Sequence, residues 1–179
     1  MKKILLLTFV LTFSVTTFAI SLYCGVGKER IQYNSIEDIL RTIDPNILPH
    51  TPYQSDELYS PYIEVLDQKA NDIRNYVISK YGEDLSNLTN KEVIVLGLIM
   101  IPFEARDAVA GRISNEQAFD CMMTAIGVAT GLNALYSLWT TGASTATILS
   151  TLKAILKFGG GWFAVGYGVW KFGQCVGWW

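Results

Sequence analysis

Acidic residues are missing from the last third of this 179-residue chain. No aspartate or glutamate follows Asp120, and residues 121–152 contain no charged residue of either sign. The charges that remain after this stretch are three lysines, Lys153, Lys157 and Lys171. An apolar, weakly cationic segment of this kind is unusual for a soluble enzyme and favours contact with a membrane or a lipid-like surface.

Catalytic and metal-binding motifs are also scarce. The single histidine, His50, lies in a proline-rich loop, and no C-x-x-C or His/Cys spacing typical of a zinc site occurs. The G-x-S-x-G nucleophile motif and glycine-rich phosphate loops are absent as well. The carboxylate pairs Glu104–Asp107 and Glu116–Asp120 lie about one helical turn apart, but each has a nearby arginine, as is usual on a solvated helix face. We therefore expect no enzyme activity, no metal and no cofactor.

The N-terminal residues have the organisation of an export signal. Lys2 and Lys3 precede the uncharged apolar stretch 4–18, and Thr17-Phe18-Ala19 places small residues where a signal peptidase requires them. The apolar stretch has about 15 residues, whereas a spanning helix needs roughly 20. A cleaved signal peptide over residues 1–19 is therefore favoured over a retained anchor. This predicts a secreted or cell-envelope protein.

The three cysteines are best considered in that exported setting, where thiols tend to pair. Cys121 and Cys175 bracket the apolar segment and are the predicted disulfide pair. Closing a loop of this length would stabilise the fold by roughly 4 kcal/mol in the chain-entropy model. Cys24 is then left over, and it is lipidated, free or paired with another molecule. Lipidation is the weaker alternative, because Ser21-Leu22-Tyr23 fits a lipoprotein signal poorly.

Charge divides the mature chain into two regions. Residues 20–120 contain nine basic residues and all 16 acidic ones, a balance of −7, whereas residues 121–179 have a balance of +3. Apolar residues at helical spacing and no strand-type alternation predict an all-α fold. Residues 20–120 are expected to form a small helical domain of four helices. Their predicted starts follow the capping residues Ser35, Ser60, Thr89 and Ser114.

The third of these helices has an unusual composition. Val93–Ile101 is apolar on every side, and at about nine residues it is too short to span a bilayer. The sequence therefore predicts a buried core helix. Pro102 is expected to interrupt it, with a kinked continuation over Phe103–Ala110.

The apolar region, residues 121–179, is expected to form a helical hairpin. Met122–Leu138 is predicted to be one helix, with a G-x-x-x-G pair at residues 127–131 that favours close helix packing. A second helix is predicted from Thr145, and the triple glycine at 159–161 breaks or bends the chain. Because bonded cysteines have Cα atoms about 6 Å apart, the return arm must come back to the start of the first helix.

Two environments are open to this hairpin. It either contacts a membrane, or it forms the core of a soluble bundle that the acidic helices cover. Membrane contact is favoured by tryptophans that suit the headgroup region and by lysines that attract anionic lipid. The predicted membrane-contact residues are Trp162, Trp170, Trp178, Trp179, Lys153, Lys157 and Lys171.

Three stretches carry a resemblance to a known class of peptides. They are Ala129-Thr130-Gly131-Leu132-Asn133, Thr147-Ile148-Leu149-Ser150-Thr151-Leu152 and the glycine-rich stretch after Lys157. In style they resemble the hydrophobic Gly/Ala-rich membrane-active bacteriocins. The resemblance implies an exported precursor, in which an acidic region keeps an apolar effector soluble and the C-terminal part disturbs target membranes.

Two functional hypotheses follow. The first is an exported bacterial protein whose C-terminal hairpin associates with or disrupts membranes rich in anionic headgroups. The alternative is a non-enzymatic structural or interaction protein, anchored in the envelope of its producer, whose acidic helices bind a protein partner. Basic residues are too few and too dispersed for nucleic-acid binding.

Overall fold

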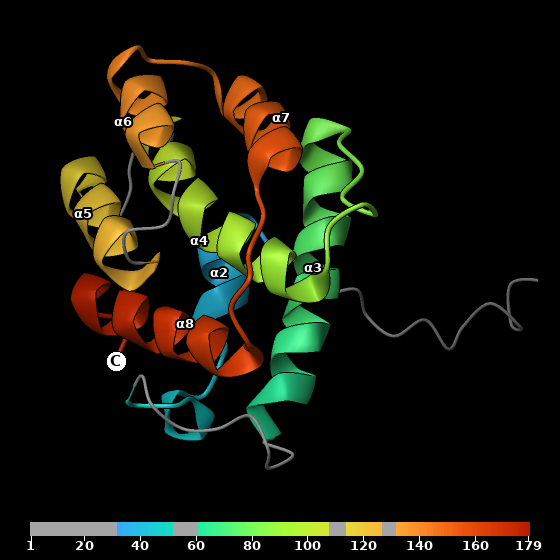
Figure 1. Cartoon of the computed structure of the whole chain (residues 1–179), viewed down its shortest axis with the longest axis vertical. Coiled ribbons are helices and arrows are strands. Elements are labelled where there is room, and N and C mark those ends of the chain that lie inside the picture. The colour runs from blue at the N-terminus through green and yellow to red at the C-terminus, as the bar shows by residue number, and fades with distance from the viewer. Residues whose placement is uncertain (1–31, 52–60, 108–113, 127–131) are drawn as a thin grey trace, which may run out of the picture. The chain divides into compact units, whose positions relative to one another are not determined.

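The fold is built around α4 (Asn90–Asp107), the helix whose sequence is apolar on all sides. Every residue of Val93–Ile101 is buried, as predicted. Such a helix is stable only where other helices cover it. The helices packed against it are α2 (Ile36–Arg41), α3 (Pro61–Tyr81), α5 (Asn115–Ile126), α7 (Thr145–Ile155) and α8 (Trp162–Val176), as Figure 1 shows.

The computed structural model describes residues 32–51, 61–107, 114–126 and 132–179. Besides the helices around α4, these residues form α6 (Leu132–Thr140) and the short 3-10 helix η1 (Pro45–Ile47), and none of them forms a strand. The predicted all-α class is thus confirmed. The signal peptide, Cys24 and the 127–131 glycine pair lie outside the described residues.

Capping residues set the helix boundaries as the sequence indicates. The Ser35 hydroxyl accepts the backbone N–H of Asp38 at the start of α2, at 3.0 Å. At the start of α4, Glu92 accepts the backbone N–H of Thr89 at 2.9 Å and donates its own N–H to the Thr89 hydroxyl at 3.3 Å, forming a capping box. Gly82, with φ of +71°, follows α3 in the left-handed conformation typical of a helix end.

The expected interruption at Pro102 is wrong, because α4 runs through this residue as one element. Proline removes one backbone hydrogen bond from a helix, and its ring crowds the carbonyl four residues earlier. Here the residues on both sides of Pro102 are fully buried, Ile101 at 1% and Phe103 at 0% exposure. The free energy of that burial outweighs the lost bond.

A disulfide joins the first and last helices of the apolar region. Cys121 on α5 and Cys175 on α8 are bonded, with Cα atoms 5.5 Å apart, so the predicted pair is confirmed. The helix expected over Met122–Leu138 differs, because the described residues form α5 up to Ile126 and α6 from Leu132. The two bonded helices, α5 and α8, pack directly on each other, and α6 and α7 lie between them in sequence.

The two regions of composition share one core. Residues 33–179 form a single compact unit, and the boundary expected after Asp120 falls within α5. The core includes Leu66 and Ile73 from the acidic region together with Leu149 and Phe172 from the apolar region, all at most 1% exposed. The division into residues 20–120 and 121–179 therefore describes charge rather than two compact units.

One carboxylate is buried within this core. Glu104, only 8% exposed, accepts the backbone N–H of Ile36 at the start of α2, at 2.9 Å. Its other oxygen accepts the hydroxyls of Tyr76 and Tyr81, at 2.7 and 2.6 Å, and lies 3.2 Å from Lys80 Nζ. Glu104 thus ties α2, α3 and α4 together. The expectation of a solvated Glu104 is wrong, because neighbouring helices supply the donors that a buried carboxylate requires.

The phenol of Tyr76 is held in its neutral form by this arrangement. Burial, followed by the negative charge and hydrogen bond of Glu104, raises the pKa of Tyr76 well above its ordinary value. The Lys80 ammonium lies over the rings of Tyr76 and Tyr81, 4.9 and 5.3 Å from their centroids. The Tyr76 hydroxyl therefore remains a hydrogen-bond donor at physiological pH.

Glu104→Leu is expected to destabilise the protein by about 3–5 kcal/mol, because it leaves the buried donors without their acceptor. Tyr81→Phe removes one donor and should cost about 1.5–3 kcal/mol. Urea unfolding followed by circular dichroism measures both. A Glu104→Leu protein that is as stable as Tyr81→Phe would contradict the central role of this carboxylate.

Loss of the disulfide should lower the free energy of unfolding by roughly 4 kcal/mol, because the bond closes a loop between residues separated by 54 positions. The comparison is between Cys24→Ser and Cys24→Ser/Cys121→Ser/Cys175→Ser, so that no odd thiol confuses the result. Equal urea midpoints in the two proteins would show that the bond contributes nothing to stability.

Candidate membrane-contact surface

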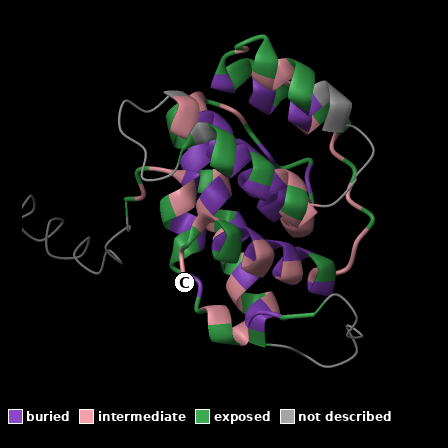
Figure 2. Ribbon diagram, turned by 90° about the vertical axis from the view of Figure 1, so that its left-hand side faces the viewer, coloured by how far each residue is buried: buried purple, intermediate pink, exposed green. Residues whose placement is uncertain are grey.

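The segment of residues 132–152, called here the uncharged segment, contains α6, the following turn and most of α7, and it has no charged residue. Its inward side chains are apolar and buried: Leu135 of α6 and Ile148, Leu149 and Leu152 of α7 are at most 4% exposed. Figure 2 shows buried residues where the helices meet and exposed residues on their outer sides. The segment therefore has one side committed to the core and one side free of charge that faces outward.

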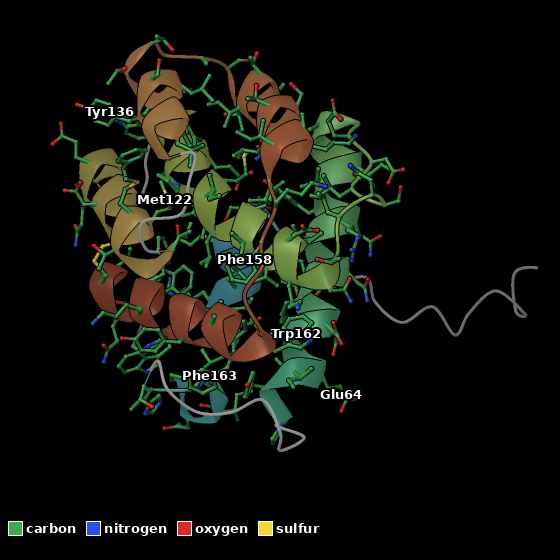
Figure 3. The ribbon with its side chains drawn as sticks, in the orientation of Figure 1. Glu64, Met122, Tyr136, Phe158, Trp162 and Phe163 are labelled. Atoms are coloured by element: carbon green, nitrogen blue, oxygen red, sulfur yellow. A yellow bond between two sulfur atoms is a disulfide. The ribbon has the colours of Figure 1, made fainter. Side chains whose placement is uncertain are left out.

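Large apolar side chains lie on this outer side and beside it. Tyr136 on α6 is 59% exposed, and Ile155, at the end of α7, is 49% exposed. Figure 3 shows Tyr136 projecting outward from α6. Among the described residues, the other large exposed apolar side chain is Ile78 on α3, at 52%.

Six hydroxyls of the uncharged segment bond within the segment. Ser144 and Thr147 share a hydrogen bond between their hydroxyls at 2.8 Å. Other hydroxyls donate to a backbone carbonyl three or four residues earlier; they belong to Thr140, Thr141, Ser150 and Thr151. A hydroxyl satisfied in this way requires no water, so it is tolerated in an apolar environment.

Aromatic rings attach α6 to the rest of the protein. The ring of Trp139 stacks on Phe119 of α5 at 4.8 Å and meets Phe103 of α4 edge-on at 5.2 Å. The guanidinium of Arg106 lies 5.7 Å from the Trp139 ring and donates a hydrogen bond to the carbonyl of Ala143. Arg106, which also lies 5.6 Å from the Phe103 ring, therefore connects the turn between α6 and α7 to two aromatic rings.

The three predicted membrane-contact lysines differ in their surroundings. Lys153 forms an ion pair with Glu83 at 3.1 Å, and its side chain is 28% exposed. Lys157 is exposed and lies near Glu92. Lys171 is half-buried on α8. Contact of these lysines with lipid stays a prediction.

Glu92 connects the start of α4 to the chain between α7 and α8. One carboxylate oxygen completes the capping box, and the other accepts the backbone N–H of Phe158 at 3.4 Å. Burial would raise the pKa of Glu92, but the hydrogen bonds from Thr89 and Phe158 and the charge of Lys157 together lower it below its ordinary value. The ionised form of Glu92 is therefore stabilised by the fold.

The C-terminal tryptophans pack against the protein. Trp178 donates its ring N–H to Glu37 at 3.2 Å and meets Phe172 edge-on at 5.2 Å. Trp179 covers Gly173 so closely that a Cβ there would come within 2.2 Å of the indole ring. A side chain at residue 173 would therefore displace the Trp179 indole from this position.

The other two tryptophans are also partly buried. Trp170 stacks on His50 at 4.8 Å and on Tyr167 at 5.8 Å. Trp162 lies at the start of α8, packed against the core (Figure 3). All four tryptophans predicted to contact a membrane are partly covered by the protein. Their contact with lipid stays a prediction.

Sequence reasoning missed the glutamates that touch the apolar region. Glu37, Glu83 and Glu92 each contact a residue beyond position 150, although they lie far from it in sequence. The opposite net charges of the two regions were the one available signal. That signal indicates attraction but not which residues meet.

Comparison with known proteins gives no relative: no family model, no curated protein and no solved structure matches this chain. Within the described residues, no helix combines the length and apolar character that crossing a membrane requires. The same residues contain no group of three or more His, Cys, Asp or Glu side chains placed to hold a metal ion.

Glu92 should make the free energy of unfolding depend on pH in the acidic range. Because its folded pKa is lowered, its contribution is fully present above the ordinary glutamate value and is lost as the pH falls through the folded pKa. Glu92→Gln keeps the capping box but removes this titration. Urea unfolding between pH 6 and about pH 3 should therefore show a shallower loss of stability in the variant than in the unsubstituted protein. If the stability of the two proteins fell equally with pH, the lowered pKa of Glu92 would be contradicted.

Proposed function

We propose that this chain is an exported bacterial protein whose C-terminal region associates with membranes and disturbs them. The observation that carries the proposal is the uncharged segment, whose outer side has no charge and whose bonded hydroxyls require no water. Transfer of such a surface from water to a lipid interface costs little free energy, because few of its polar groups give up hydrogen bonds to water. The acidic region, which covers the other side of the same helices, keeps them in solution until they meet lipid.

Helix length favours an interfacial position over a spanning one. With nine and 11 residues, α6 and α7 are about 14 and 17 Å long. The hydrocarbon core of a bilayer is about 30 Å thick, so neither helix reaches across it. Both would lie in the plane of the headgroups, with Tyr136 and Ile155 directed into the acyl region.

The cationic and aromatic residues would then strengthen the attachment. Lys153 and Lys157 follow the uncharged segment directly and would meet anionic headgroups. Trp162, at the start of α8, would lie at the interface, where an indole ring is favoured. The resemblance to membrane-active bacteriocins suggests that the target is another bacterial cell.

The full mature chain, residues 20–179, should bind vesicles that contain an anionic phospholipid more tightly than vesicles of phosphatidylcholine alone. Sedimentation with the vesicles measures binding, and release of an entrapped dye measures disturbance of the bilayer. Ala146→Glu places a charge on the exposed side of α7 and should weaken binding roughly tenfold.

The matched control is Asn75→Glu, which adds the same charge to the exposed side of α3 and should leave binding almost unchanged. Equal effects of the two substitutions would show that the uncharged segment is not the part of the protein that binds the vesicles. No binding to either kind of vesicle would overturn the function itself. The alternative hypothesis would then remain, namely an envelope protein that binds a partner through its acidic helices.

A further inference from the structure

Three glutamates of the acidic region contact residues at or beside the predicted membrane-contact positions. Glu83, after α3, pairs with Lys153 at 3.1 Å. Glu92 accepts the backbone N–H of Phe158 beside Lys157, and Glu37 accepts the indole N–H of Trp178 at 3.2 Å. These three interactions are called here the glutamate contacts. Each joins the acidic region to the C-terminal third of the chain.

We propose that the glutamate contacts are autoinhibitory: they hold the C-terminal region closed on the acidic region, and anionic headgroups release it by replacing the carboxylates. The inference rests on the proposed membrane association. A carboxylate and a lipid phosphate offer the same chemistry to an ammonium or an indole N–H, namely an anionic oxygen acceptor. Lys153 in its ion pair therefore has to exchange one anion for another before α7 settles on a membrane.

The exposure of these contacts makes the exchange feasible. The side chains of Lys153 and Glu83 are 28% and 33% exposed, so lipid can reach the pair without prior unfolding. An ion pair that is this open to water stabilises only weakly. A membrane surface, which concentrates many anionic groups, competes well against a single weak pair.

The covalent structure lets the C-terminal end of α7 move without loss of the fold. The disulfide joins α5 to α8, whereas the contacts of Glu83 and Glu92 lie on α7 and on the chain just after it. Residues 156–161 that follow α7 are not helical and include three successive glycines. Release of these two contacts would therefore free the C-terminal end of α7 and the chain after it, while Ile148 and Leu149 stay in the core and the α5–α8 pair stays bonded.

The test measures opening and membrane binding separately. Glu83→Gln should increase hydrogen exchange of the α7 amides in the absence of lipid by about two- to fivefold, the factor expected for one exposed ion pair. It should raise affinity for anionic vesicles by a similar factor. The matched control is Glu116→Gln, which makes the same charge change at an exposed carboxylate on α5. The charge exchange Glu83→Lys/Lys153→Glu should restore slow exchange in α7, whereas Glu83→Lys alone should not.

The outcomes separate the inference from the function on which it rests. Faster exchange and tighter binding in Glu83→Gln, with neither change in Glu116→Gln, would support the inference. Vesicle binding by the unsubstituted protein that Glu83→Gln does not increase beyond the control would overturn autoinhibition and leave the proposed function intact. Faster exchange in α7 without vesicle binding by any variant would overturn the proposed function, and autoinhibition with it.

Discussion

The structure depends on the need to cover α4. This helix is apolar around its whole circumference, so it has to be enclosed by other helices on all sides. The acidic region supplies α2, α3 and the first half of α5, and the apolar region supplies the rest of α5, α7 and α8. Neither region could bury α4 alone, and for this reason two stretches of opposite charge fold into one compact unit. Glu104, on α4 itself, adds a directional constraint, because its hydrogen bonds reach both α2 and α3.

The same requirement explains the surface that we relate to function. Covering α4 uses the inner sides of α7 and α8, and the outer side of the uncharged segment is left over without a charge. A surface selected only for solubility would normally carry charged residues there. The contacts of Glu37, Glu83 and Glu92 lie around the C-terminal residues and join them to the part of the chain that is rich in carboxylates. The fold thus contains an apolar, uncharged element together with the acidic region that holds it.

Local features of the fold were readable from the sequence, and long-range ones were not. Ser35, Thr89 and Ser114 cap helices as expected, since capping depends on residues within one turn. The pairing of Cys121 with Cys175 followed from the compositional unit that they bracket. Three other features depend on residues far away in the chain, which periodicity does not indicate. They are the burial of Glu104, the continuity of α4 at Pro102 and the hydrogen bond from Trp178 to Glu37. For the candidate surface, the absence of charge could be predicted from the sequence. The hydrogen bonds of the hydroxyls and the contacts of the glutamates could not, because they depend on the three-dimensional fold.

The central claim is that the exposed side of α7 contacts lipid while the exposed side of α3 does not. An environment-sensitive fluorophore attached at Ala146→Cys on α7 or at Ser79→Cys on α3, both exposed positions, in a Cys24→Ser background tests this most directly. On anionic vesicles, the emission maximum of the α7 label should shift to the blue, and nitroxide-labelled lipid should quench it. The α3 label should keep the emission maximum that it has without vesicles. Identical spectra of the α7 label with and without vesicles, in protein that sediments with the lipid, would contradict the account.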